Sequence, residues 1–270
     1  MAHAQINGFS MHYQLHGDAG EPLVLVHGYT GDVGDFADQI PEFAKTHRVL
    51  VLDHRGHGAS EGPTDRSSYT ITTMADDVEA IAAHAGFERY HLVGHSMGGM
   101  VAQEIALRSP HRLLSLMLFG TGPDFPMGKI EPVRKYMEAR NRLAEEQGMA
   151  AVVALPARFP DPPHMPPGRK DYEKARMLKM PVEGMIGGWN AMASWHGVRD
   201  RVKDIRTPTL VMAGALEPAV ESIKYLHSQI AGSKIVIVPE AAHCPQFERP
   251  EIFNAALREL LTANASVRTA

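Results

Sequence analysis

The chain has 270 residues, of which 44% are hydrophobic and 21% charged, and its formal net charge is −4 at pH 7. This composition is that of an ordinary globular protein and excludes an intrinsically disordered chain. The slight acidic excess offers no basic surface for a nucleic-acid backbone, so we expect a small molecule rather than nucleic acid as the partner.

The first elements expected are two short antiparallel strands joined at Asn7-Gly8, a dipeptide typical of tight hairpins. Apolar runs that are continuous rather than alternating follow, at residues 22–26, 48–52, 90–93, 113–119, 209–213 and 234–238. Such runs are typical of strands buried on both faces of a parallel sheet. Helical patterns occupy residues 73–84, 97–108 and 252–261. The alternation of strands and helices along the chain predicts an α/β fold, with a mostly parallel, twisted sheet of about eight strands and helices on both faces.

The alternation of strand and helix stops between residues 122 and 199. This stretch contains both tryptophans, eight of the fifteen methionines and a proline cluster at residues 160–167. We interpret it as a helical insertion that lies over the sheet. The predicted organisation is therefore a first core part (1–121), an inserted cap (122–199) and a second core part (200–270).

A candidate nucleophile lies where the third of these apolar runs meets a helix. Gly94-His95-Ser96-Met97-Gly98 fits the G-x-S-x-G pattern, in which a sharp strand-to-helix turn holds the serine in a strained conformation with its hydroxyl exposed. The same turn places the backbone N–H of Met97 at a helix N-terminus, where it can donate to a developing oxyanion.

With this motif in place, the chain resembles the α/β-hydrolase fold family over nearly its whole length. Five segments in the family's order support the resemblance: residues 25–29, 53–60, 94–99, 208–214 and 242–250. The insertion at 122–199 falls where members of the family have a helical cap.

The resemblance implies a catalytic triad. The family's histidine position matches His243, which would take the proton of Ser96. The acid that orients the histidine is expected at Glu217, after the strand at residues 209–213, where members of the family usually have aspartate. The other candidate is Asp124, near the end of the strand at residues 113–119. The order serine, acid, histidine fits both candidates.

The remaining site residues are positional inferences. Similarity to the family's His-Gly-x motif assigns the second oxyanion-hole N–H to Tyr29, as the partner of Met97. The substrate pocket is expected in the cap, although the same side chains could instead pack the cap helices together; the candidates are Met180, Met185, Trp189 and Met192.

No cofactor or metal is required by this chemistry. The only cysteine, Cys244, excludes an intrachain disulfide and leaves a cysteine-based zinc site without ligands. His54 and His57, three residues apart outside a helix, are a weak metal signal. The opening residues lack a signal-peptide pattern and no apolar run reaches the length of a membrane span, about 18 residues, so we expect a cytoplasmic protein without a membrane partner.

The function implied is that of a serine hydrolase that cleaves an ester or lactone of a small to medium apolar acid through an acyl-enzyme on Ser96. The alternative is a hydrolase of carbon–carbon bonds in ring-cleavage products, whose members commonly have asparagine and tryptophan where this chain has His95 and Cys244. Cofactor-free perhydrolases or haloperoxidases, which usually have tryptophan at the position of Tyr29, and ligand receptors on the same fold are further alternatives. The serine excludes the family's aspartate-dependent dehalogenases and epoxide hydrolases. The sequence makes no prediction about oligomeric state.

Overall fold

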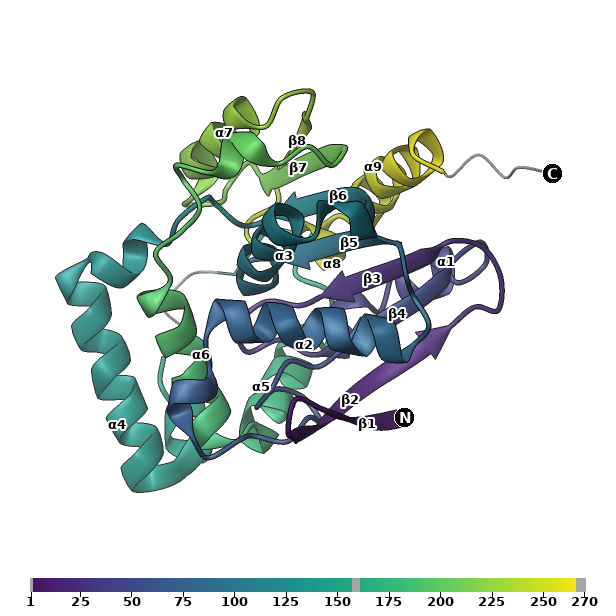
Figure 1. Cartoon of the computed structure of the whole chain (residues 1–270). Helices are drawn as coiled ribbons and strands as arrows, with labels where there is room; N and C mark the ends of the chain where they lie inside the picture. The colour runs from purple at the N-terminus through teal and green to yellow at the C-terminus, as the bar shows by residue number, and fades with distance from the viewer. Residues whose placement is uncertain (1, 157–160, 266–270) are drawn as a thin grey trace.

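The computed structural model describes residues 2–156 and 161–265. Within them, one eight-stranded sheet has the order β1-β2-β4-β3-β5-β6-β7-β8 (Figure 1). The strands from β3 to β8 run parallel, and β2 joins them antiparallel through β4. The strands are β1 (Ala2–Ile6), β2 (Phe9–His16), β3 (Pro22–Val26), β4 (Arg48–Leu52), β5 (Tyr90–His95), β6 (Leu113–Phe119), β7 (Thr209–Gly214) and β8 (Lys234–Val238). The predicted α/β class and mostly parallel sheet are confirmed.

The N-terminal hairpin forms the edge of this sheet, as predicted. Ile6 pairs with Phe9, so Asn7 and Gly8 alone make the turn, and both have positive φ, 46° and 88°. Asparagine and glycine are the residues that adopt this conformation at least cost.

Helices cover both faces of the sheet. The α-helices are α1 (Ile40–Phe43), α2 (Ile71–His84), α3 (Met97–Arg108), α4 (Glu131–Val153), α5 (Arg169–Lys179), α6 (Val182–Ser194), α7 (Val220–Gln229), α8 (Pro245–Glu248) and α9 (Pro250–Ala263). Short 3₁₀ helices are η1 (Val33–Phe36), η2 (Arg66–Ser68), η3 (Pro110–Arg112), η4 (Pro126–Lys129) and η5 (Val202–Asp204). Two helices begin before the predicted patterns: Thr70 caps α2 by accepting from the N–H of Thr73, and Pro250 starts α9, where a missing N–H costs nothing.

Five of the continuous apolar runs are explained by burial on both sides. The sixth, at residues 234–238, is the edge strand β8, in which only Val238 is buried, so the expectation of burial on both faces was wrong there. In β3, Val24 and Val26 belong to the same buried cluster as α2 and α3, whereas Leu23 and Leu25 belong to the cluster that includes α1 and α9. Successive residues of a strand point to opposite faces, so a strand covered on both faces needs apolar residues throughout.

The insertion between β6 and β7 contains α4, α5 and α6, which stand together at one end of the molecule beside the sheet and α2 (Figure 1). The three helices have a small buried core of their own, formed by Ala144, Met149, Val152, Met180, Met185 and Ile186. This arrangement agrees with the expected cap. No helix within the described ranges has the length and apolarity needed to cross a membrane.

Parallel strands place their carboxyl ends at one edge of the sheet. Ser96 follows β5, Glu217 follows β7 and His243 follows β8, so three residues that are far apart in the sequence come to the same edge. This is the position at which open α/β sheets form their binding sites.

Candidate active site

Ser96 occupies a strained turn between β5 and α3. Its φ and ψ are 51° and −114°, a region that residues with a Cβ rarely adopt and that costs of order 1–3 kcal/mol. The turn is fixed by hydrogen bonds from the Ser96 N–H to the carbonyl of Phe119 and to the Ser96 carbonyl from the N–H groups of Gly99 and Met100. The predicted nucleophile elbow is present as a backbone conformation.

The glycines around the serine are required by close backbone contacts. A Cβ on Gly98 would lie 2.5 Å from the carbonyl oxygens of Val26 and His27, and one on Gly94 would lie 2.5 Å from the carbonyl oxygen of Gly98. Any larger side chain would push α3 away from β3 and β5. The helix that follows Ser96 therefore packs against the sheet only because these two positions lack side chains.

His243 is held by Glu217. The Nδ1–H of the imidazole donates to Oε2 of Glu217 at 2.5 Å, and Oε1 of the same carboxylate accepts from the N–H of Ala219 at 3.1 Å. The Glu217 side chain is 5% exposed, whereas that of His243 is 45% exposed. The acid is thus buried and fixed, while the imidazole remains open on its other side.

This pairing shifts the pKa values of both groups in opposite directions. Burial lowers the pKa of His243, but the hydrogen bond and charge of Glu217 outweigh it, so the pKa lies above its usual value of 6.5. Burial raises the pKa of Glu217, and the hydrogen bond and charge of His243 more than offset this, so the pKa lies below 4.5. The pair therefore favours a carboxylate next to an imidazole that accepts a proton readily.

A cavity of about 190 Å³ lies beside these residues. The core lines it with Ser96, His243, His95 and Cys244, with Tyr29 and Thr30 from the loop after β3, and with Asp35 from η1; the cap contributes Arg169, Glu173 and Arg176. The three cap residues are spaced four and three positions apart, so they share one face of α5. Ser96 and His243 therefore open onto the same small space, which the cap closes with charged side chains.

The charged wall of the cavity was not predicted from the sequence. Asp35 accepts from Nη1 of Arg176 at 2.5 Å and also from Nη2 of Arg169, and the charges of the two arginines lower the pKa of Asp35 despite its burial. Arg169 in addition stacks on Phe247 at 4.0 Å. A charged helix face is usually a solvated one, so its spacing alone gave no signal of a site.

Comparison with known proteins agrees with this architecture. Residues 21–250 match the alpha/beta hydrolase fold family. The chain belongs to this family. It is 30% identical to a putative carbamate hydrolase RutD of Azorhizobium caulinodans over 95% of this chain and 97% of that protein. Among solved structures, it resembles the enol-lactonase of Burkholderia xenovorans LB400, with a TM-score of 0.85, 26% identity and coverage of 97% and 100%. A thermophilic esterase of Thermogutta terrifontis gives a TM-score of 0.83 at 27% identity, with coverage of 98% and 99%.

Of the two candidate acids in this family member, the structure brings Glu217 to His243. Asp124 instead accepts from Nε of Arg199 at 2.7 Å, and Arg199 stacks on Tyr225. Asp124 thus has a partner elsewhere and makes no hydrogen bond to His243.

The two residues proposed as oxyanion donors, Met97 and Tyr29, both lie near Ser96. Met97 is the first residue of α3, where N–H groups have no partner within the helix, and Tyr29 lines the cavity that contains Ser96. The Tyr29 hydroxyl donates to the carbonyl of Met185 at 2.7 Å and accepts from Arg140. Its side chain therefore links the loop after β3 to the cap.

The four cap residues suggested as pocket liners are buried. Met180 and Met185 lie in the cap's own core, and Trp189 and Met192 lie in the larger cluster shared with α2 and α3. None of the four is among the described residues that line the cavity. Their part in substrate binding stays a prediction that the cavity does not support.

The histidines considered for metal binding are buried and neutral. Burial lowers the pKa of His54 far below 6.5 and that of His57 to about 3. Across residues 2–156 and 161–265, no group of three or more His, Cys, Asp or Glu side chains is arranged to hold a metal ion.

Buried histidines predict a loss of stability in acid. His57 and His95 both have pKa values of about 3 in the fold, whereas the unfolded chain binds protons near pH 6.5. Stability is therefore complete above pH 6.5 and falls as the pH drops below it, by about 2 kcal/mol per histidine between pH 7.5 and 5.0. Urea unfolding at the two pH values measures this, and His57→Gln should reduce the difference. Equal unfolding free energies at both pH values would contradict the prediction.

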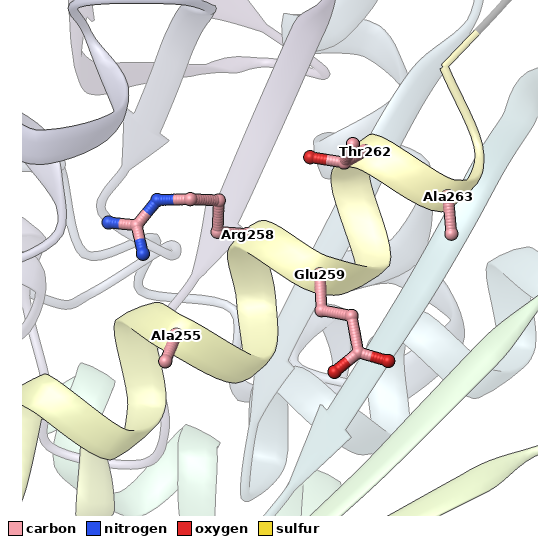
Figure 2. Close-up of a pocket in the computed structure, with 5 residues that line it drawn as sticks. All are labelled: Ala255, Arg258, Glu259, Thr262 and Ala263. Carbon is pink, nitrogen blue, oxygen red and sulfur yellow. The ribbon is translucent and has the colours of Figure 1, made fainter.

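A larger hollow, about 450 Å³, lies on the surface of α9. Figure 2 shows the five residues that line it, with the Arg258 and Glu259 side chains pointing in different directions: Ala255, Arg258, Glu259, Thr262 and Ala263. Arg258 pairs with Glu42, and Glu259 pairs with Lys234. Its charged groups are thus already paired, and it includes neither Ser96 nor His243.

Proposed function

We propose that this α/β-hydrolase is a serine hydrolase that cleaves a small carboxylic ester or lactone. The supporting observation is the Glu217–His243 hydrogen bond at 2.5 Å next to the strained Ser96, with all three groups at one edge of the sheet. The relatives named as an enol-lactonase and an esterase support the same class of reaction.

In the proposed reaction, Ser96 Oγ attacks the carbonyl carbon while Nε2 of His243 accepts the hydroxyl proton. The backbone N–H groups of Tyr29 and Met97 stabilise the oxyanion. Nε2 then donates the proton to the leaving alkoxide, which departs as the alcohol. Water, deprotonated by the same nitrogen, attacks the acyl-enzyme and releases the acid. Glu217 keeps Nδ1 protonated throughout, so that Nε2 is the nitrogen that exchanges the proton.

The cavity favours a short acyl group. Its volume is about 190 Å³, whereas sites for drug-sized ligands have volumes of about 300–1,000 Å³. A long apolar chain would have to pack against the charged side chains of Asp35, Arg169, Glu173 and Arg176 without offering them hydrogen bonds, which is unfavourable. We therefore propose a substrate at the small end of the small to medium range that the sequence suggested, and a more polar one than the apolar acid expected there.

A panel of p-nitrophenyl esters with acyl groups of two to twelve carbons tests both points. We expect kcat/KM to be highest for two to four carbons and to fall by about tenfold or more at eight carbons, because each buried methylene would desolvate charged groups. The Ser96→Ala protein provides the background rate. An optimum at eight or more carbons would contradict the proposed pocket, and equal rates in both proteins would contradict the proposed nucleophile.

A further inference from the structure

One buried carboxylate binds the backbone on both sides of His243. Oε2 of Glu248 accepts from the N–H of Ala242 at 2.5 Å, and Oε1 accepts from the N–H of Cys244 at 2.9 Å. Glu248 is only 5% exposed. The two oxygens of a single side chain thus accept from the N–H groups of the residues that precede and follow the proposed base.

This contact is more than an ordinary helix cap. Glu248 ends the short helix α8, and its side chain reaches back to the N–H of the N-cap residue Cys244, as the glutamate of a capping box does, although Glu248 is at N4 rather than N3. The second oxygen reaches two residues farther, to Ala242, which lies outside the helix. A cap alone requires only the first of these hydrogen bonds.

Two further contacts complete the hold on His243. The Nε2–H of His95 donates to the His243 carbonyl at 2.9 Å, and Glu217 binds the ring at Nδ1. His95 stacks on Phe119 with ring centroids 4.6 Å apart, so it is itself fixed by the core. The N–H groups on both sides, the carbonyl and the ring of His243 are each bound by a different atom.

The position of a loop residue's imidazole depends on its backbone, because a small rotation of the peptide moves Nε2 by a large fraction of an ångström. A misplacement of about 1 Å can cost about 10²-fold in rate. The charges around His243 come from the loop after β7, η1, α5 and α8, and four carboxylates face two guanidinium groups there: Glu217, Asp35, Glu173 and Glu248, with Arg169 and Arg176. The neutral His95 and Cys244 complete the surroundings.

We propose that Glu248 is a positioning residue for His243, which fixes the backbone on both sides of the imidazole. The carboxylate of Glu248 also favours the protonated imidazole by its negative charge. The kinetic part of this proposal rests on the proposed function, in which His243 is the base. The part that concerns protonation of His243 does not depend on any substrate.

Two variants separate position from charge. Glu248→Gln keeps the shape but removes the charge and replaces one acceptor by a donor; Glu248→Asp keeps the charge but shortens the reach. Glu251→Gln is the matched control, since Glu251 lies three residues later with a side chain that is 61% exposed. The titration of His243 is followed by NMR of histidine-labelled protein, with the signal assigned through His243→Gln, and kcat and KM are measured on the best ester of the panel.

We expect Glu248→Gln to lower the pKa of His243 by about half a unit to one unit and to lower kcat by about 10–100-fold with KM within about threefold. Glu248→Asp should keep the pKa close to the wild-type value while kcat still falls. Glu251→Gln should change neither quantity.

Wild-type values of both the pKa and kcat in a folded Glu248→Gln protein would overturn the proposal. The proposal would also be overturned if kcat fell only in proportion to the fraction of folded protein while the pKa of His243 stayed unchanged. Glu248 would then act only as a helix cap. If Glu248→Gln does not fold, Glu248→Asp decides: a lower kcat at unchanged KM supports the proposal and a wild-type kcat overturns it. Absence of Ser96-dependent turnover in the wild-type protein would contradict the proposed function, and the titration would still test Glu248.

Discussion

Replacing Ser96 by alanine should lower kcat for the best ester by at least about 10⁴-fold. Without Oγ no acyl-enzyme can form, and only the oxyanion donors and the bound geometry remain to accelerate attack by water. The fold should be unchanged, because no hydrogen bond within the elbow uses the serine hydroxyl; those at Ser96 involve its backbone.

The measurement is a steady-state rate with the ester of the highest kcat/KM, together with circular dichroism and the urea midpoint of both proteins. The exposed Ser67, which lies in η2 away from the cavity, provides the control, and Ser67→Ala should retain the wild-type rate. An undiminished rate in Ser96→Ala would rule out nucleophilic catalysis by this residue.

Replacing Glu217 by glutamine should lower kcat by about 10³–10⁴-fold with little change in KM. The amide of glutamine can accept from Nδ1–H only when its oxygen faces the ring, and it has no charge to stabilise the imidazolium. The pKa of His243, which the hydrogen bond and charge of Glu217 hold above 6.5, should fall. Activity therefore declines while the acid limb of the kcat/KM profile moves to lower pH.

Asp124→Asn is the matched control for this prediction, since it removes the same charge from the other candidate acid. Asp124 pairs with Arg199, so the rate should stay within about threefold of the wild type, as for substitutions at surface ion pairs. If Asp124→Asn abolished turnover and Glu217→Gln did not, the assignment of the acid would have to be reversed.

The cap lines the cavity beside Ser96 with charged side chains. α5 presents Arg169, Glu173 and Arg176 to the cavity, while Asp32 and Asp35 of the core loop accept from Arg176. These ion pairs join cap and core across the site. The chain-length panel and the Ser96 variant together therefore report on the cap as well as on the chemistry.

Local patterns in the sequence were sufficient to predict the sheet and the strand-to-helix turn at Ser96, whereas His243 was proposed from the resemblance to the α/β-hydrolase fold family. Continuous apolar runs indicate strands covered on both faces, and glycines two residues before and after a serine indicate a turn with close backbone contacts. Both signals depend on a residue and its immediate neighbours. The hairpin at Asn7-Gly8 was predictable for the same reason, since the turn requires positive φ.

The choice between Glu217 and Asp124 was decided only by tertiary structure. Both acids follow a strand that ends at the same edge of the sheet, and which of them contacts His243 depends on how β6, β7 and the cap pack. Packing also buried Met185 in the cap core and turned the charged face of α5 toward the cavity. The periodicity of the sequence around a residue indicates whether that residue is buried. Its contacts with distant elements depend on how those elements pack in three dimensions. The choice between the two acids, the cavity wall and the Glu248 contact therefore emerged only from the fold.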